Sequence, residues 1–288
     1  MCRVVDLQQA VLAKNDGLAA ALREDLAQRG VTVVNLLSSP GSGKTALLEC
    51  VLRRATQRAV PVAALTADLA TENDARRLAR SGAPVKQVLT GGLCHLEADQ
   101  VRGHLEGWLP EGTRVLFVEN VGNLVCPASY DLGERLRVAM MSVTEGEDKP
   151  VKYPTAFGLA NLVVLGKTDI AEAVGFGEKE FAASVERVNP GVEVLRTSSR
   201  TGEGVDLLLD RVLAVCHGDL PHQPLLAAQH RSAHRHDHGP DGGHVHDHAD
   251  GLTHRHGHDP AHDHSHGPVD EDPGPGAETA RTTGVPVR

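Results

Sequence analysis

Apolar and polar positions alternate along the chain, up to about Cys216, in blocks that are typical of an α/β protein. Apolar residues recur with the helical period near 44–57, 72–80, 95–107, 178–188 and 203–215. Alternating strands and helices of this kind predict a parallel sheet covered on both faces, with ligands at the carboxyl ends of the strands. The short apolar runs that fit its buried strands lie near 31–37, 60–67, 85–89, 113–119, 160–166 and 192–197.

The two ends of the chain differ from this central block. A helix with one apolar face is predicted over 4–29, and Gly30 stops it. After Cys216 large apolar side chains almost disappear, and nearly all of the chain's 17 histidines lie from His217 to His266. Such a segment buries too little apolar surface to offset its ordering entropy. We therefore divide the chain into an N-terminal helix (1–30), an α/β domain (31–216) and a disordered His-rich tail (217–288).

Composition narrows the function classes. A formal net charge of −9 leaves no basic field to attract a phosphate backbone. No apolar run approaches the roughly 18 residues needed to cross a bilayer, and the N-terminus lacks the apolar region of a signal peptide. We therefore expect a cytoplasmic protein that has neither nucleic acid nor a membrane as its partner. The cysteines also argue against a disulfide framework, because they are sparse and odd in number. The five are Cys2, Cys50, Cys94, Cys126 and Cys216.

A glycine-rich loop follows the first apolar run and precedes a helix. The stretch from Ser38 to Thr45, Ser-Ser-Pro-Gly-Ser-Gly-Lys-Thr, fits the phosphate-binding pattern G-x-x-x-x-G-K-S/T except at Ser38, where a glycine is expected. Small residues let backbone N–H groups surround a polyphosphate at the N-terminus of a helix. Lys44 then reaches the terminal phosphates, and the Thr45 hydroxyl ligates magnesium. The predicted nucleotide-binding residues of this loop are Gly41, Ser42, Gly43, Lys44 and Thr45.

Acidic residues at two further strand ends extend this site. Asp68 ends the second predicted strand, where it either serves magnesium and the attacking water or caps a helix. Asp74 behind it either moves with the γ-phosphate or lies on a solvated helix face. The stretch from Glu119 to Gly122 resembles the Asp-x-x-Gly element of nucleotide triphosphatases, with glutamate in place of aspartate. Glu119 then supports magnesium, and the Gly122 N–H senses the γ-phosphate. A buried, unpaired glutamate among apolar neighbours is costly, which favours a site role. The candidate catalytic residues are Lys44, Asp68 and Glu119.

Two later loops predict the base. The stretch Leu-Gly-Lys-Thr-Asp, which contains Lys167 and Asp169, resembles the guanine-binding Asn-Lys-x-Asp element. Asp169 accepts hydrogen bonds from guanine N1 and from the exocyclic amine, donors that adenine lacks in this arrangement, and therefore predicts GTP. Gly166 replaces the asparagine, so we expect a base contact and a tie back to the phosphate loop to be missing. Ser198 and Ser199 belong to a stretch that resembles the Ser-Ala-Lys loop packed on the guanine ring.

Soft metal ligands form a second candidate site. Cys94 and His95 follow a pair of glycines at a strand end, and Cys126 lies just after the element that contains Glu119. Sulfur and imidazole suit nickel or zinc. One chain offers too few nearby ligands of this kind for a closed site, so we expect two subunits to contribute. Cys50, between apolar neighbours, is interpreted as an inert small apolar residue.

The tail is the third candidate. Its His-x-His and His-Asp-His repeats place imidazoles two residues apart in a flexible chain, which can wrap several divalent ions. The alternative interpretation is a solvated low-complexity tail that has no function. The expected nickel ligands are His234, His236, His238, His244, His246, His248, His254, His256, His258, His262, His264 and His266.

Five strings within residues 4–216 point to one family: the phosphate loop with Asn35 before it, Cys94-His95, Glu119 to Pro127, Ser142 to Pro150 and Lys152 to Pro154. With these strings the chain resembles the nickel-incorporation GTPases of nickel–iron hydrogenase maturation, the HypB family. The resemblance implies a parallel-sheet P-loop NTPase of the SIMIBI type that forms a homodimer when GTP is bound. It implies a metal site of Cys94, His95 and Cys126 at the subunit interface, and a Lys149 or Lys152 that reaches towards nucleotide in the facing subunit. The chain departs from some members in having only Cys2 where they carry Cys-x-x-Cys-Gly-Cys, and in having its histidines after the domain.

The leading hypothesis is a GTPase metallochaperone. It binds nickel in the tail and at the interface, hydrolyses GTP slowly, and delivers nickel to a hydrogenase large-subunit precursor or to another nickel accessory protein. The competing hypothesis is a nickel storage protein in which nucleotide only sets dimerisation. A small-molecule kinase is disfavoured, because no substrate motif is evident and Asp169 points to guanine. The expected cofactors are GTP, Mg²⁺ and Ni²⁺, with Zn²⁺ as the alternative metal.

Overall fold

The computed structural model describes residues 2–68, 73–227, 244–247 and 253–256. The chain divides into two units, Met1–His234 and Arg235–Arg288, and each is described by itself. In the second unit, β8 (His244–Asp247) pairs antiparallel with β9 (Thr253–His256). The other predicted tail ligands lie outside the described residues: His234, His236, His238, His248, His258, His262, His264 and His266.

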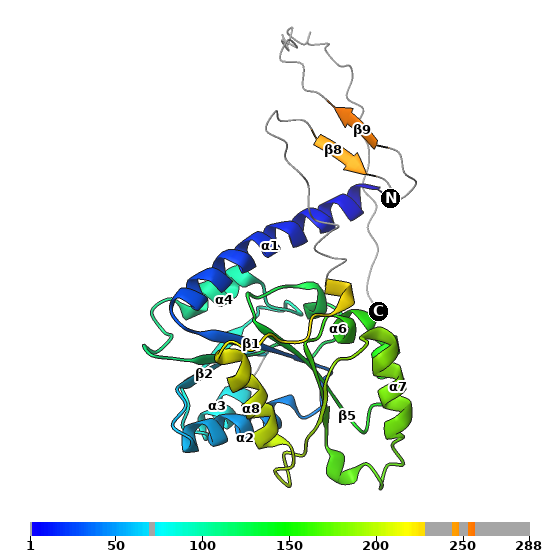
Figure 1. Ribbon diagram of the computed structural model, residues 1–288. Helices are drawn as coiled ribbons and strands as arrows, with labels where there is room; N and C mark the ends of the chain where they lie inside the picture. Colours follow the sequence, from blue (N-terminus) through cyan, green and yellow to red (C-terminus); the bar gives the residue numbers. More distant parts are fainter. Residues whose placement is uncertain (1, 69–72, 228–243, 248–252, 257–288) are drawn as a thin grey trace, which may run out of the picture. The chain divides into compact units, whose positions relative to one another are not determined.

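A seven-stranded parallel sheet forms the centre of the first unit (Figure 1). The strand order is β3-β2-β4-β1-β5-β6-β7, and every neighbouring pair is parallel. The predicted fold class is therefore confirmed, and the loops after each strand meet at one edge of the sheet. The strands are β1 (Thr32–Ser38), β2 (Val62–Asp68), β3 (Val85–Leu89), β4 (Val115–Glu119), β5 (Leu136–Ser142), β6 (Leu162–Gly166) and β7 (Val194–Arg196).

One strand of this sheet, β5, is not predicted by the hydrophobic pattern. Its sequence, Leu-Arg-Val-Ala-Met-Met-Ser, contains a single β-branched residue, so its intrinsic preference for a strand is weak. It nevertheless lies between β1 and β6, and all its residues except Arg137 are buried. Burial between two neighbouring strands stabilises a segment whose local sequence does not specify it.

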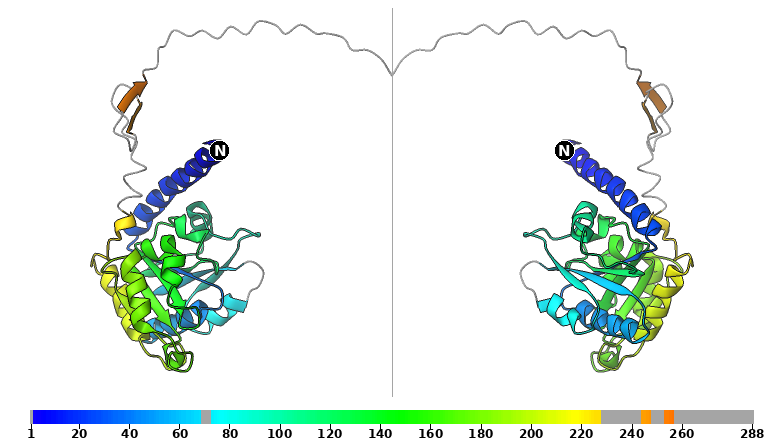
Figure 2. Two further views of the ribbon diagram at one scale, coloured as in Figure 1. Left: turned by 90° about the vertical axis from the view of Figure 1, so that its right-hand side faces the viewer. Right: turned by 90° about the vertical axis from the view of Figure 1, so that its left-hand side faces the viewer.

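Helices cover both faces of the sheet, and Figure 2 shows α2 and α3 on one side and α1 and α4 on the other. Alternate residues of each strand face the two layers, so Val34 and Phe117 belong to the core beneath α2, α3 and α8, and Val33 and Leu116 to the core beneath α1 and α4. A third core lies beneath α6 and α7 on the second face. No helix among the described residues is long and apolar enough to span a membrane. The helices are α1 (Cys2–Gln28), α2 (Lys44–Gln57), α3 (Asn73–Ala79), α4 (Ala98–Leu105), α5 (Lys149–Lys152), α6 (Pro154–Gly158), α7 (Glu178–Val188) and α8 (Val205–Cys216), with short 3-10 turns η1 (Pro127–Ser129) and η2 (Thr168–Ile170).

The chain stays on the domain after α8. Asn161 Nδ2 donates a hydrogen bond to the backbone oxygen of His222 at 2.8 Å, and the His222 ring lies 2.8 Å from Asn189 Oδ1. Pro224 is buried, and Leu226 packs close to Gly158. Residues 217–227 therefore differ from the disorder expected of them, because a few apolar and polar side chains anchor them.

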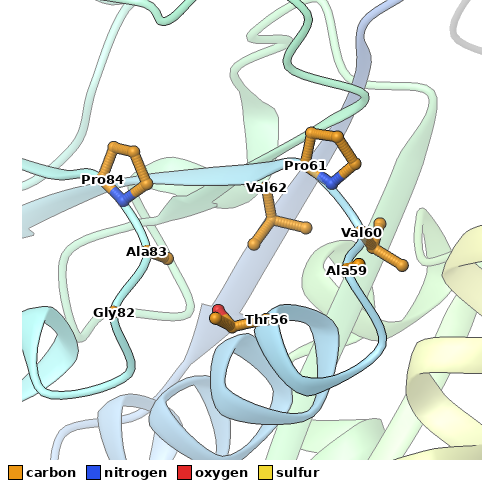
Figure 3. A pocket seen from close by; sticks show the side chains of 8 residues that line it. All are labelled: Thr56, Ala59, Val60, Pro61, Val62, Gly82, Ala83 and Pro84. Atoms are coloured by element: carbon orange, nitrogen blue, oxygen red, sulfur yellow. The ribbon is translucent and has the colours of Figure 1, made fainter.

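A small apolar hollow lies at the amino ends of β2 and β3 (Figure 3). This is the opposite end of the sheet from the phosphate loop. None of its lining side chains is titratable, so it offers no chemistry. The lining residues are Thr56, Ala59, Val60, Pro61, Val62, Gly82, Ala83 and Pro84.

Two glycines before α8 allow a test of steric constraint. Gly204 has a φ of 70°, and a Cβ there would overlap the backbone oxygen of Arg196. Gly202 has a φ of 84°, but a Cβ there would meet nothing closer than Arg54 Nη2 at 4.0 Å. We expect Gly202→Ala to lower the free energy of unfolding by about 1 kcal/mol through backbone strain. Gly204→Ala should lower it by on the order of 3 kcal/mol, because the backbone must move. Urea unfolding measures both, and equal losses would contradict the steric account.

Candidate nucleotide and metal sites

The phosphate loop connects β1 to α2 at the carboxyl edge of the sheet. Gly41 and Gly43 have φ angles of 75° and 96°, which side-chain-bearing residues rarely adopt. This conformation brings the chain into α2 at Lys44 with no side-chain cap on the first turn. The Ser42 hydroxyl is buried and has no hydrogen-bond partner among the described residues. Uncapped N–H groups and a free hydroxyl at a helix N-terminus fit a polyphosphate.

Glu119, at the end of β4, is 1% exposed and has three partners. Lys44 Nζ lies 3.4 Å from its Oε1, and the Thr45 hydroxyl donates to the same oxygen at 2.5 Å. The Thr66 hydroxyl donates to Oε2 at 2.9 Å. The premise that Glu119 is unpaired is therefore wrong, since an ion pair and two hydroxyls satisfy its charge. Thr45 and Glu119 nevertheless offer the oxygen ligands that suit magnesium, directly or through water.

Gly122 lies directly against the phosphate loop. A Cβ at this position would lie 3.2 Å from Pro40 Cα and 3.3 Å from Pro40 N. Any side chain would push the two segments apart, which explains the glycine. The contact puts Gly122 beside the loop that it is predicted to serve, and its role as a γ-phosphate sensor stays a prediction.

Asp68 and Asp74 lie on either side of residues 69–72, which are outside the described part of the chain. Asp68 is the last residue of β2 and pairs in register with Leu89. Asp74 lies in the first turn of α3, where a carboxylate interacts favourably with the helix dipole. The catalytic role of Asp68 and the switch role of Asp74 stay predictions.

The loop after β7 holds the carboxylate of Asp169. Ser198 Oγ donates to Oδ1 at 2.6 Å, and Arg200 Nε donates to Oδ2 at 2.7 Å. These two hydrogen bonds, the one from Ser198 first, lower the pKa of Asp169 below its ordinary value. The ionised carboxylate is an acceptor that suits the N1–H and exocyclic amine of guanine, and a base that donates to both oxygens competes with Arg200. Cys50, half-buried on α2, contacts the same loop through Sγ, 3.6 Å from the backbone oxygen of Ser199.

Lys167 ties the base-binding loop to the phosphate loop. Its Nζ donates to the backbone oxygen of Gly41 at 2.8 Å, and its φ of 59° is unusual for a residue with a side chain. The tie expected to be missing is therefore present, made by the residue after Gly166. A Cβ on Gly166 would lie 2.7 Å from Met140 Cε, so Met140 fills the space beside it.

The candidate soft-metal ligands follow β3 and β4 at the same edge of the sheet. The neighbouring Cys126 side chain, chiefly through hydrogen bonding, and then burial raise the pKa of the Cys94 thiol above its ordinary value. Cys94 Sγ lies 3.6 Å from His95 Nδ1. His95 Nε2 is buried without a hydrogen-bond partner, and Glu97 Oε1 is 3.6 Å away. Two neighbouring sulfurs and a free imidazole nitrogen are donors that fit nickel or zinc.

These ligands do not close a site within one chain. Among the described residues, no three metal-binding side chains converge on one point. The ring of His95 stacks on Tyr130, with centroids 3.9 Å apart and planes at 28°. Burial, and then the charges of Glu97, Cys126 and Cys94, raise the pKa of Tyr130, which keeps its hydroxyl protonated. A metal at these residues needs further ligands, and their supply by a second subunit stays a prediction.

Lys149 and Lys152 make ion pairs within their own chain. Lys149 Nζ lies 3.2 Å from Glu145 and 4.8 Å from the ring centre of Tyr153. Lys152 Nζ lies 2.7 Å from Asp148, and its side chain is 63% exposed. Either lysine must exchange an internal carboxylate for phosphate if it serves the facing subunit.

The structure adds three residues to those predicted. Thr66 bonds Glu119, Arg200 bonds Asp169, and Tyr130 stacks on His95. A threonine within an apolar strand was the available signal for Thr66, and the arginine at the lysine position of the Ser-Ala-Lys-like loop was the signal for Arg200. Nothing in the spacing of the sequence indicated Tyr130.

Four features of the first unit together define a P-loop nucleotide-binding protein. They are the parallel sheet, the glycine loop between β1 and α2, the buried carboxylate at the end of β4, and the loops after β6 and β7.

Comparison with known proteins narrows this class. Residues 32–196 match the CobW/HypB/UreG nucleotide-binding domain. The hydrogenase maturation factor HypB of Rhizobium leguminosarum bv. viciae is 44% identical over 204 residues, 71% of this chain and 68% of the relative. HypB of Escherichia coli K12 is 45% identical over 208 residues, 72% of this chain and 71% of the relative. The crystal structure of Helicobacter pylori HypB in complex with nickel is 36% identical, has a TM-score of 0.67, and aligns with 72% of this chain and 97% of that one. The chain belongs to the HypB family of hydrogenase maturation factors, as the sequence resemblance predicts.

The buried ion pair can be tested without nucleotide. Lys44→Ala leaves the charge of Glu119 buried without a counter-ion, and we expect it to lower the free energy of unfolding by about 3 kcal/mol. Adding Glu119→Gln removes that charge, so the double variant should lose less than the two single variants together. Urea unfolding of the parent, both single variants and the double variant gives the coupling energy. Strictly additive losses would show that the pair does not stabilise the phosphate loop.

Proposed function

We propose that this chain is a GTPase that binds nickel and delivers it during hydrogenase maturation, to the large-subunit precursor or to another nickel accessory protein. The observation that carries the proposal is the path of one short segment. It begins at Glu119, beside Lys44 of the phosphate loop, and ends at Cys126, beside Cys94. The names of the HypB relatives, and the nickel in the Helicobacter structure, support this assignment.

The residues of the phosphate loop carry the nucleotide chemistry. Lys44 and the backbone N–H groups after Gly41 bind the phosphates, and the arriving phosphates offer Lys44 a second anionic partner beside Glu119. Thr45 and, through water, Glu119 hold magnesium, which when bound neutralises charge on the phosphates. Asp68 orients the attacking water. Slow hydrolysis in the absence of a partner is expected of such a site.

The contact of Gly122 with Pro40 links nucleotide to metal. A γ-phosphate that engages Gly122 moves the start of the segment that ends at Cys126, and so repositions that sulfur. We propose that GTP thereby drives formation of a homodimer in which symmetry doubles the ligands Cys94, His95 and Cys126. Exposed apolar side chains beside these loops favour burial against a second copy: Leu89, Leu93 and Val125 are 62%, 44% and 64% exposed.

The tail serves as a local reserve of nickel in this proposal. In the second unit, where β8 pairs with β9, His244 lies in register with His256, and His246 with His254. Pairing of histidine positions across two strands favours binding of a shared ion. Thiolate and imidazole bind nickel and zinc alike. The proposal of nickel rather than zinc therefore rests on the nickel complex of the Helicobacter relative. The cytoplasm stays the expected location.

Guanine preference follows from Asp169. We expect GTP to bind more tightly than ATP, because adenine leaves the carboxylate without its two donors, at a cost of roughly 1–3 kcal/mol. Asp169→Asn should shift the preference to xanthine nucleotides, whose 2-position carries an oxygen acceptor. A competition assay measures both, with Asp206→Asn on α8 as a surface control that should change nothing. Equal binding of ATP and GTP by the parent would overturn the assignment.

Nickel at the interface should depend on GTP and on both cysteines. A variant that ends after Ala227 keeps the segment packed on the domain and removes the tail ligands. We expect it to bind nickel stoichiometrically with GTP and magnesium, and Cys94→Ala and Cys126→Ala to abolish this binding. Cys216→Ala, which changes a half-buried cysteine at the end of α8, is the matched control. Calorimetric titration with GTP and with GDP makes the measurement.

The outcomes separate the proposed function from its competitor. Stoichiometric nickel binding by Cys94→Ala and Cys126→Ala in the GTP state would remove the link from nucleotide to metal. In cells, loss of hydrogenase maturation on tail removal but not in Lys44→Ala would favour a storage protein. Loss in Lys44→Ala, with the variant folded and present in cells at the level of the parent, supports the GTPase.

A further inference from the structure

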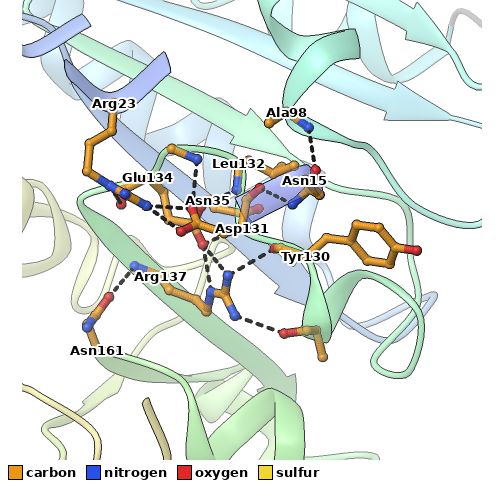
Figure 4. Close-up of polar contacts among 12 residues, drawn as sticks. Asn15, Arg23, Asn35, Ala98, Tyr130, Asp131, Leu132, Glu134, Arg137 and Asn161 are labelled. Atoms are coloured by element: carbon orange, nitrogen blue, oxygen red, sulfur yellow. Dashed lines mark hydrogen bonds and ion pairs between the residues drawn. The ribbon is translucent and has the colours of Figure 1, made fainter. Parts of the chain in front are cut away.

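Asn15 of α1 joins the two loops that carry the candidate metal ligands (Figure 4). Its side chain is 3% exposed. Its Nδ2 donates to the backbone oxygen of Asp131 at 2.8 Å, and its Oδ1 accepts a hydrogen bond from the backbone N–H of Ala98 at 3.0 Å. Ala98 opens α4 shortly after His95, and Asp131 follows Tyr130 at the end of the loop from Cys126. A single amide therefore bridges the two backbones.

The two backbone groups depend on this amide. The first N–H groups of a helix have no partner within the helix. In α4, Glu97 and Gln100 form a capping box that serves other donors of the first turn, and Asn15 serves Ala98. Without Asn15, the Ala98 N–H is buried and unpaired, which costs about 1–3 kcal/mol. The start of α4, and the loop that leads into it, are thus held from α1.

The rest of α1 holds Asn15 in place. Arg23 forms an ion pair with Asp131, in which its Nη2 lies 2.6 and 2.5 Å from the two carboxylate oxygens. A Cβ on Gly133 would lie 3.0 Å from the backbone oxygen of Ala19 and 3.1 Å from the backbone nitrogen of Arg23, so the helix rests closely on this segment. Two contacts along α1 therefore fix the helix against the loop after Tyr130. Because Asn15 also accepts a hydrogen bond from Ala98, the position of α1 fixes the start of α4 relative to that loop.

We propose that Asn15 is a positioning residue for the metal site of Cys94, His95 and Cys126. It sets the separation of the two ligand loops, so that the ring of His95 from one loop stacks on Tyr130 from the other. This inference rests on the proposed metal function of these residues. It makes α1 part of the metal site, although α1 supplies no ligand to it.

The test uses the full-length protein and an optical signal from cysteine. The tail contains no cysteine, so the thiolate-to-nickel charge-transfer band excludes nickel bound there, and the part of the band that is lost in Cys94→Ala reports the interface site. Asn15→Leu removes both hydrogen bonds at similar volume. With GTP present, we expect the nickel concentration that gives half of the band to rise at least about tenfold, as is typical when groups behind metal ligands are lost. GTP affinity should stay unchanged.

Asn189→Leu is the matched control. Asn189 is 1% exposed, and its Nδ2 donates to the backbone oxygens of Phe157 and Ala160, both at 2.8 Å. Asn189→Leu should lower the free energy of unfolding by about as much as Asn15→Leu and leave the charge-transfer band unchanged. Asn15→Asp provides a second variant of the same shape, which keeps the acceptor for Ala98 but loses the donor to Asp131. It should weaken the band, and it decides the matter if Asn15→Leu does not fold.

Each result counts for or against the role of Asn15. An unchanged band in Asn15→Leu, or in Asn15→Asp if only that variant folds, would overturn it. So would equal weakening in Asn189→Leu, or a parallel loss of GTP affinity, because either result indicates a general structural effect. A band that persists in Cys94→Ala would instead refute the proposed metal site itself.

Discussion

The ion pair between Lys44 and Glu119 is the interaction on which the arrangement of both candidate sites depends. Both side chains are almost completely buried, so each charge is tolerated only while the other is present. The hydroxyls of Thr45 and Thr66 complete the hydrogen bonds of the Glu119 carboxylate. The pair joins the start of α2 to the end of β4. Since β4 runs on into the segment that ends at Cys126, the phosphate loop and the metal loop share a single anchor in the core.

Features with local causes could be predicted from the sequence. Gly41 and Gly43 take conformations that glycine alone adopts readily, and the apolar runs match six of the seven strands of the sheet. The parallel topology then brings the predicted loops to one edge. The strand β5 could not be predicted, because its residues are poor strand formers and burial between β1 and β6 decides its conformation. Asn15 and Arg200 were missed for a related reason, since their partners are distant in sequence.

Two expectations show how composition and motif matching can mislead. Composition averaged over residues 217–288 predicts disorder throughout, but Pro224 and the hydrogen bonds of His222 hold the first part to the domain. Motif matching at Gly166 predicts a missing link, but Lys167 supplies it from the next position. In both cases a small number of specific contacts outweighs the average or the pattern. Such contacts become visible only when the chain is folded.

The close fit of Met140 against Gly166 constrains how this sequence can vary. Met140 Cε occupies the volume that any side chain at position 166 would enter. Met140 also belongs to β5, an inner strand of the sheet, so a shorter residue there would leave a cavity in the core while position 166 stays glycine. The contact falls on the flexible end of Met140, so a small side chain at position 166 needs only a shift of that methyl group, whereas a bulkier one also needs a smaller residue at position 140. Positions 140 and 166 should therefore be inherited as a pair, and an alignment of related sequences should show them changing together.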